Sequence, residues 1–239
     1  MDSGAMHVIP GLKVLYFGTP VVLVGTRNPG GDTNIAPMSS AWWLDQTAVL
    51  GLGNASQTAV NLRREGECVL NLAASTQVDA VDRIAMTTAR ADIPQYRREQ
   101  GYRFEPDKFG AAGLTEQASE LVAPSRIAEC PIQLECTLVA HHPLDRGELN
   151  CTAFEVKVLR AHVDESLVIP GTHYVDPDAW DPLIMKFCEF YGGGSRLRPS
   201  KLAVGWKMPH AAGPTGEPAD PASAPGYASL GGASFVSTT

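Results

Sequence analysis

The sequence predicts a mainly β fold in which antiparallel strands form a barrel with a few peripheral helices. Two long runs, Pro131–His141 and Leu149–Val163, carry this prediction. Apolar and polar residues alternate along both runs, which is typical of strands with one buried and one wetter face. Helical periodicity is confined to short stretches. A closed barrel is the economical way for such a sheet to hide its edges.

The first quarter of the chain predicts short strands separated by turns. Residues 12–28 form two strands or one kinked strand, because Gly18 and Pro20 interrupt a β-branched and aromatic run. The segment 28–32 (NPGGD) is a turn. Residues 34–40 (NIAPMSS) are expected to be a polar, proline-containing loop. It leads into strands over Met38–Leu44 and Thr47–Gly53, which a tight hairpin at Asp45 and Gln46 joins.

Helical signals appear from Thr58 onwards. A short helix begins there and ends at Gly66, a strand follows over Cys68–Ala73, and a second helix is expected over Asp79–Arg90. Residues 92–112 show no period and are expected to hold at most one further short helix. The connection 142–148 fits a hairpin between the two long strands. Residues 178–191 are expected to be partly helical, with Pro182 in the first turn.

Three segments follow from this pattern. Residues 1–12 are expected to be a flexible N-terminal segment, and residues 13–208 form one domain. Residues 209–239, rich in Ala, Gly, Pro and Ser, form a disordered tail, because such a composition buries too little surface to offset the entropy of ordering.

Composition narrows the possible partners. The chain has 239 residues, a net charge of −7 and no basic block, which argues against nucleic acid and anionic membranes. No apolar run reaches the ~20 residues that span a bilayer. The N-terminus lacks the features of a signal peptide, so a cytoplasmic location is expected. The five cysteines match no zinc motif and are interpreted as structural thiols, and no metal site is expected.

Two clusters of small polar residues are the candidate binding groups. They stand where loops leave strands, a common place for such groups: Asn34, Ser39 and Ser40 in the first, and Asn54, Ser56, Gln57, Thr58 and Asn61 in the second. The second cluster begins a helix, whose free N–H groups and positive dipole end favour a phosphate. The arrangement suits a nucleotide-like cofactor with a phosphate at one end and a flat ring at the other.

Other motifs give weaker signals. Residues 51–53 (GLG) lack the third glycine and the acidic residue of a dinucleotide-binding fold, and residues 192–194 (GGG) are interpreted as a flexible turn. His141 and His142 face opposite sides of a strand, so they cannot bind one metal together. The basic stretch with Arg196, Arg198 and Lys201 is either a solvated loop or a holder of an anionic group.

The order of segments resembles the flavin reductase-like family, the FMN-binding split-barrel proteins that include flavoredoxins. The similar segments extend over residues 14–201. They are NIAPMSS, GNASQTAVN, KFGAAGLT, PIQLECTLV, AFEVKVLRAHVDE and YVDPDAWDPLIMKF. The chain departs from many family members at Gly147 and Glu148, where Leu149 follows instead of histidine. That difference makes direct oxidation of NAD(P)H less assured.

The resemblance implies a split β-barrel, a homodimer and FMN as cofactor. Asn34, Ala36, Pro37, Met38, Ser39 and Ser40 would contact the ring or the ribityl chain of FMN. Ser56, Gln57, Thr58 and Asn61 would hold its phosphate. Asn54, Gln57 and Thr58 stand where a basic residue is often found, so a remote cation such as Arg196 or Arg198 would be needed. Trp42 or Trp43 flanks the ring or, as the commoner outcome, is buried in the barrel.

Three functions remain open on this basis. The first is a flavin reductase that transfers a hydride from NADH or NADPH to FMN, with the reduced flavin serving a flavin-dependent monooxygenase or another electron acceptor. No side chain is assigned a catalytic role, because the flavin performs the redox chemistry. The second is a flavoredoxin-like electron carrier that keeps its FMN. The third is a non-redox barrel that binds flavin or another aromatic ligand.

Overall fold

The computed structural model describes residues 7–144, 150–198 and 200–211. They fall into two compact units, the first within residues 1–164 and 181–194 and the second within residues 165–180 and 195–239. The tail expected from residue 209 lies almost wholly outside the described residues. So do half of the expected N-terminal segment and the departure from the family pattern at 147–149.

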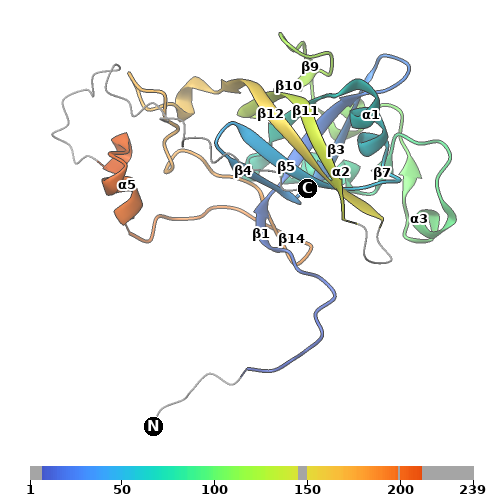
Figure 1. Ribbon diagram of the computed structural model, residues 1–239, viewed down its shortest axis with the longest axis horizontal. Helices are drawn as coiled ribbons and strands as arrows, with labels where there is room; N and C mark the ends of the chain where they lie inside the picture. The colour runs from blue at the N-terminus through green and yellow to red at the C-terminus, as the bar shows by residue number, and fades with distance from the viewer. Residues whose placement is uncertain (1–6, 145–149, 199, 212–239) are drawn as a thin grey trace, which may run out of the picture. The chain divides into compact units, whose positions relative to one another are not determined.

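A seven-stranded antiparallel sheet forms the body of the first unit (Figure 1). Its strand order is β3–β2–β6–β11–β12–β5–β4. The bounds of these strands are β2 Val22–Arg27, β3 Thr33–Met38, β4 Ala41–Leu44, β5 Thr47–Gly53, β6 Glu67–Leu72, β11 Ile132–Pro143 and β12 Cys151–Val163. The long hairpin of β11 and β12 confirms the two alternating runs, which pair from Ile132 with Val163 to Pro143 with Thr152.

The sheet is a split barrel rather than a barrel closed by hydrogen bonds. Its two edge strands, β3 and β4, are consecutive in the chain and are joined only by Ser39 and Ser40. Strand β3 pairs with its neighbour β2 and β4 with its neighbour β5, and among the described strands β3 and β4 do not pair with each other. The two edges therefore meet at this junction and leave a seam in the barrel.

The expected loop over residues 34–40 is wrong for most of its length. Thr33–Met38 form β3, which pairs with β2 from Thr33 and Arg27 to Met38 and Val22. Local sequence suggested a loop because Pro37 cannot donate to a strand ladder. An edge strand has one unpaired side, and there a proline is tolerated. Only Ser39 and Ser40 lie outside the strands before Ala41.

The first helix follows the sequence prediction closely. Helix α1 comprises Gln57–Glu65 and ends at Gly66, whose φ of 72° is left-handed. Helix α2, Val78–Ala85, is shorter than expected because the chain becomes extended at strand β7, Thr87–Thr88. Residues 92–112 contain two short helices rather than at most one, α3 Gln95–Glu99 and α4 Lys108–Ala112. Strand β8, Arg103–Phe104, lies between them and pairs with β7.

Residues 178–191 are not helical, contrary to expectation. Strands β13, Ile184–Lys186, and β14, Glu189–Tyr191, form a hairpin, and β13 also pairs with β1, Phe17–Pro20. Pro182 lies in a bridge to Ala74 instead of a first helical turn. Pairing with β1 is a long-range interaction that local sequence does not reveal. The apolar spacing within residues 178–191 therefore suggested a helix.

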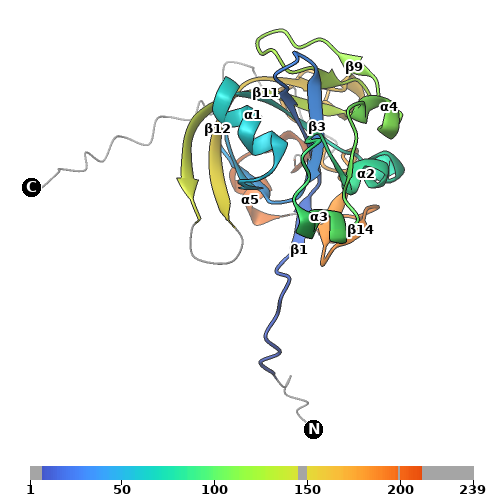
Figure 2. The same cartoon turned by 90° about the vertical axis from the view of Figure 1, so that its right-hand side faces the viewer.

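Helices α2 and α4 cover one side of the sheet beside β3 (Figure 2). Their apolar side chains complete the main core with those of β2, β3 and the neighbouring loops. The buried members include Leu23, Ile35, Val81, Ile84, Phe109 and Ile127. Burial of apolar area at about 25 cal/mol per Å² makes this layer the main source of stability. The core fixes β3 and the start of α4 next to each other.

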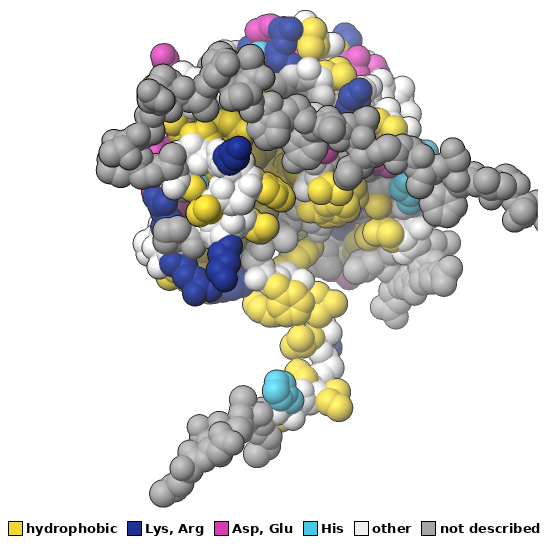
Figure 3. All heavy atoms as spheres, turned by 60° about the vertical axis from the view of Figure 1, so that its left-hand side comes forward, with side chains coloured by type: hydrophobic (Ala, Val, Ile, Leu, Met, Phe, Trp, Pro, Cys, Tyr) yellow, Lys and Arg dark blue, Asp and Glu magenta, His cyan; other side chains and the backbone are white. Residues whose placement is uncertain are grey.

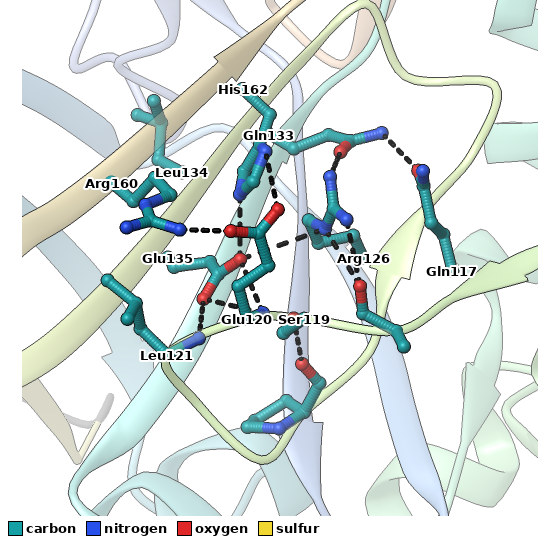
Figure 4. Close-up of polar contacts among 12 residues, drawn as sticks. Gln117, Ser119, Glu120, Leu121, Arg126, Gln133, Leu134, Glu135, Arg160 and His162 are labelled. Atoms are coloured by element: carbon teal, nitrogen blue, oxygen red, sulfur yellow. Dashed lines mark hydrogen bonds and ion pairs between the residues drawn. The ribbon is translucent and has the colours of Figure 1, made fainter.

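A buried polar cluster ties the loop around residues 115–126 to β11 and β12 (Figure 4). Short strands β9, Glu116–Gln117, and β10, Arg126–Ile127, begin and end this loop. The Glu135 carboxylate is fully buried and accepts hydrogen bonds from the N–H groups of Glu120 and Leu121. His162 Nε2 lies 2.7 Å from it. Gln133 is also buried, so the start of β11 lacks the wetter face that its alternation predicted.

The second unit contains little regular structure among its described residues. It has the short 3-10 segments η2, Glu165–Leu167, and η3, Pro209–Ala211, and helix α5, Lys201–Gly205. In the first unit, η1, Ser75–Gln77, precedes α2. Across residues 7–144, 150–198 and 200–211, no helix is long and apolar enough to cross a membrane.

Candidate functional site

A cavity of about 490 Å³ opens at the seam of the split barrel. Both predicted polar clusters contribute to its wall. From the first come Asn34, Ala36, Pro37, Met38, Ser39 and Ser40, and from the second Ser56, Gln57 and Thr58. The size lies within the range of small-molecule sites, which runs from about 300 to 1,000 Å³. The structure therefore brings together most of the residues that the sequence singled out.

The side chain of Asn34 links the two clusters. Its Nδ2 donates to Thr58 Oγ1 at 3.2 Å and to Thr26 Oγ1 at 3.4 Å. Its Oδ1 is buried and meets no donor among the described residues. An acceptor that is buried without a partner costs about 1–3 kcal/mol. This oxygen is shielded from the open cavity, so the side chain of Asn34 serves to hold β3 against the start of α1.

The start of α1 forms one end of the cavity. Ser56 caps the helix, and its hydroxyl accepts from the Ala59 N–H at 3.2 Å. The N–H groups of the first turn have no acceptor within the helix, and the helix dipole adds positive potential there. No acidic residue occupies this first turn. This end can therefore accept an anionic group.

Two arginines that the sequence analysis did not select stand at the same end. Arg97, on α3, lines the cavity, and a Cβ placed on Gly53 would lie 3.9 Å from its Nη2. Its guanidinium also covers the ring of Tyr102 at 4.7 Å. Arg90 Nη1 donates to the Ala55 carbonyl at 3.0 Å, next to the helix cap. The cation that the neutral second cluster lacks thus comes from the segment between α2 and α4.

Lys108 is a buried cation on the cavity wall. It is the first residue of α4, and its Nζ donates to the Ile35 carbonyl at 3.0 Å. Burial lowers the pKa of Lys108 to about 8, although the nearby Glu105 acts in the opposite direction. The ammonium is therefore charged at neutral pH and faces a site of low polarity. Such a group can balance a negative charge on a bound molecule.

The opposite end of the cavity is apolar. It is lined by Tyr16, Val21 and Val81 and by three residues of the β13–β14 hairpin region, Met185, Cys188 and Phe190. A long pocket with an apolar end, a buried cation and an anion-accepting end suits an amphiphilic ligand that carries a flat ring and a phosphate.

Two predicted residues of the second cluster lie behind the wall. Asn61 is fully buried, donates to Thr26 and Asn28, and accepts from Gln57 Nε2 at 2.7 Å. Asn54 accepts from Arg63 and from Thr152, away from the cavity lining. Asn61 therefore holds Gln57 in place, and direct contact of either asparagine with a ligand stays a prediction.

The predicted basic residues Arg196 and Arg198 belong to the second unit. Arg196 forms an ion pair with Asp178 of the same unit. Part of its charge is therefore already balanced. A role for either arginine in ligand binding stays a prediction.

The tryptophans on edge strand β4 are not core residues. Trp42 is more than half exposed, at 55%, contrary to the expectation of a buried barrel aromatic. Trp43 is partly buried, and its Nε1 has no partner among the described residues. Neither lines the cavity. An edge strand at the seam has one face open to solvent, which the local sequence does not reveal.

Comparison with known proteins agrees with this architecture. An uncharacterized protein of Bacillus subtilis (strain 168), YdfE, is 38% identical over 185 residues, which cover 77% of this chain and 88% of that protein. The flavoredoxin of Desulfovibrio vulgaris (Miyazaki F) superposes with a TM-score of 0.67 at 22% identity, over 83% of this chain and all of that one. Nitrilotriacetate monooxygenase component B from Bacillus cereus gives a TM-score of 0.65 at 21% identity, over 82% of this chain and all of that one.

The two solved structures support the split-barrel fold. The family is established by the sequence itself, since residues 14–183 match the flavin reductase like domain. That match includes β3, the start of α1 and Lys108, whereas Met185, Cys188 and Phe190 of the apolar end lie just beyond it. The chain is a member of the flavin reductase-like family.

Proposed function

We propose that the cavity binds FMN and that the protein is an NAD(P)H-dependent flavin reductase. The observation that carries the proposal is the set of three features of one cavity. They are the contact of Asn34 with Thr58 that joins β3 to the start of α1, the buried ammonium of Lys108, and the start of α1 with Arg97 beside it. FMN offers a matching ribityl chain, a ring that becomes negatively charged on reduction, and a phosphate.

The residues present fit this cofactor. Asn34, whose side chain reaches Thr58, would lie beside the ribityl chain, and the backbone from Ala36 to Ser40 would lie along the ring. Ser56, Gln57 and Thr58 would hold the phosphate with Arg97. Bound FMN would supply the redox chemistry by accepting a hydride from NADH or NADPH. The protein positions the ring, excludes water at the apolar end, and offers Lys108 as a fixed positive charge.

The electron acceptor and the assembly belong to the same proposal. One structural neighbour is a component of a monooxygenase, which supports a flavin-dependent monooxygenase or another acceptor as the partner. A homodimer is supported by the apolar side chains exposed along residues 8–17, seen below the body in Figure 3. All five cysteines are free thiols, which fits the cytoplasmic location expected from the sequence.

The sequence analysis left two alternatives open. The likeness to a flavoredoxin favours an electron carrier that retains FMN. A carrier would reduce slowly with NADH and NADPH but exchange electrons with a protein partner. A non-redox barrel would bind flavin or another aromatic ligand in the same apolar cavity without turnover.

The visible absorption spectrum of the purified protein tests all three. It is recorded with and without added FMN, and NADH or NADPH is then added without oxygen. Flavin bands that bleach at catalytic rates support the reductase. Bound flavin that stays oxidised favours the carrier or the non-redox barrel, and a protein that binds no flavin contradicts the proposal.

A further inference from the structure

The guanidinium of Arg97 stands on the cavity wall without a polar partner. Among the residues that the structure describes, Arg97 and Lys108 are the basic residues that line this cavity, and Lys108 Nζ donates to the Ile35 carbonyl. Arg97 forms no side-chain hydrogen bond or ion pair within the same part of the chain. Its N–H donors are therefore available to an anion. A long side chain without polar partners keeps one position only where packing restricts its rotamers.

The ring of Tyr102 supplies that restriction. The Arg97 Cζ atom lies 4.7 Å from the centre of this ring. A guanidinium at such a distance over an aromatic face is attracted by the quadrupole of the ring. Tyr102 is half-buried and lines the same cavity. The pair therefore stands at the cavity itself.

The end of helix α3 brings the two side chains together. Gly101 follows the helix with a left-handed φ of 92°, and its N–H donates to the Arg98 carbonyl at 2.9 Å. The Tyr102 N–H donates to the Arg97 carbonyl at 3.0 Å. These two bonds form a Schellman motif, in which the residue after the glycine commonly packs on the last turn of the helix. The contact between Tyr102 and Arg97 is the one that this motif favours.

The pair is held in place relative to the barrel. Directly after Tyr102, strand β8 pairs with β7, and the Arg103 N–H donates to the Met86 carbonyl at 3.1 Å. On the other side, a Cβ placed on Gly53 would lie 3.9 Å from Arg97 Nη2. Gly53 ends β5 shortly before α1 begins. The guanidinium thus reaches from Tyr102 to the end of the cavity at which the proposed function places the phosphate.

We propose that Tyr102 is a positioning residue that holds Arg97 ready for the phosphate of the bound flavin. The inference rests on the proposed function, because it requires FMN in this cavity with its phosphate at the start of α1. Tyr102 acts through Arg97 and need not touch the phosphate itself. The preference for FMN over riboflavin then depends on an aromatic ring at position 102, outside the two polar clusters.

The test measures the Kd values of FMN and riboflavin by quenching of flavin fluorescence. Tyr102→Leu removes the ring and is expected to raise the Kd for FMN about fivefold, or about 1 kcal/mol, and that for riboflavin less than about twofold. Tyr102→Phe retains the ring and should bind both flavins as wild type does. In an Arg97→Ala background, Tyr102→Leu should have almost no further effect on FMN, because the side chain that it positions is gone.

Tyr96→Leu is the matched control, since Tyr96 is an exposed aromatic residue of α3 that does not line the cavity. It should change neither Kd. An unchanged Kd for FMN in Tyr102→Leu overturns the inference, while binding of FMN by wild type leaves the proposed function standing.

Three other results also overturn the inference. Equal weakening of FMN and riboflavin would place the effect of Tyr102→Leu at the flavin ring or in the fold. A Tyr102→Phe variant as weak as Tyr102→Leu would assign the effect to the hydroxyl. A full effect of Tyr102→Leu in the Arg97→Ala background would show that Tyr102 does not act through Arg97. Absence of FMN binding by wild type instead removes the proposed function, and this inference with it.

Discussion

Lys108 Nζ donates a hydrogen bond of 3.0 Å to the backbone carbonyl of Ile35, which lies 73 residues earlier in the chain. This contact joins the first residue of α4 to edge strand β3 and places a buried ammonium on the wall of the cavity. Ile35 is itself fully buried. The packing of α4 against β3 therefore decides where the charge stands.

Replacing Lys108 by methionine is expected to make bound FMN harder to reduce. Without the ammonium, the negative charge of the reduced ring is unbalanced, and a tenfold loss of affinity for the reduced form alone corresponds to about 30 mV for two electrons. The midpoint potential of bound FMN, measured by spectroelectrochemistry at pH 7, should fall by about that amount. Lys157→Met, an exposed lysine on β12, is the control and should leave the potential unchanged.

The same lysine predicts a pH dependence. Because the pKa of Lys108 is about 8 and below its usual 10.5, the ammonium is charged at pH 7 and neutral at pH 9.5. The difference in potential between wild type and Lys108→Met should shrink as pH rises through about 8. A difference that stays constant from pH 6 to 9.5 would contradict the assignment of this charge to the flavin site.

Arg97→Ala is expected to weaken FMN binding about tenfold, since charge-assisted hydrogen bonds contribute about 1.5–3 kcal/mol. Riboflavin lacks the phosphate, so its affinity should change less than twofold. Arg98→Ala offers a matched control, because Arg98 is exposed on the same helix and does not line the cavity. Titrations of the three proteins with both flavins make the comparison. An equal loss for riboflavin and FMN would place Arg97 away from the phosphate.

Thr58→Val is expected to raise the Kd for FMN about tenfold and to lower the free energy of unfolding by about 1 kcal/mol. The substitution retains the side-chain shape but removes the oxygen that accepts from Asn34. Asn61→Ala should also weaken binding, because Asn61 holds Gln57. Val60→Thr, at an exposed position of the same helix, should change neither quantity. Unchanged FMN affinity in Thr58→Val and Asn61→Ala together would remove the phosphate site from α1.

Glu135→Gln tests the buried polar cluster. Burial raises the pKa of Glu135, but hydrogen bonds from Glu120, Leu121 and His162 outweigh it and leave the pKa below its usual 4.5. A lowered pKa means that the carboxylate stabilises the fold above pH 4.5 and that this contribution is lost as pH falls through the folded-state value. The variant should lose about 3–5 kcal/mol at pH 7.

Urea unfolding at pH 7, 5 and 4 measures this effect. The stability gap between wild type and Glu135→Gln should narrow at the lowest pH, where Glu135 of the unfolded wild-type chain takes up a proton before the folded protein does. Glu189→Gln, which changes an exposed glutamate on β14, provides the control with little expected change. A gap that is independent of pH would show that the cluster stabilises by shape alone.

Local sequence was sufficient for the elements that short-range physics governs. The alternation of the β11–β12 hairpin and the end of α1 at Gly66 can each be predicted from a few neighbouring residues. Local patterns failed at β3, where Pro37 suggested a loop, and at β13–β14, where apolar spacing suggested a helix. Both segments are extended because they pair with β2 and β1, and such pairing is a property of the assembled sheet.

The sequence by itself determined the mainly β class, its family, and the two polar clusters that line the cavity. Only the tertiary structure decided that Asn34 reaches Thr58 and that Lys108 and Arg97, far along the chain, share their cavity. The reason is physical. Strand alternation and helix capping are local, whereas the meeting of polar groups depends on which strands pair and which helices cover the barrel seam.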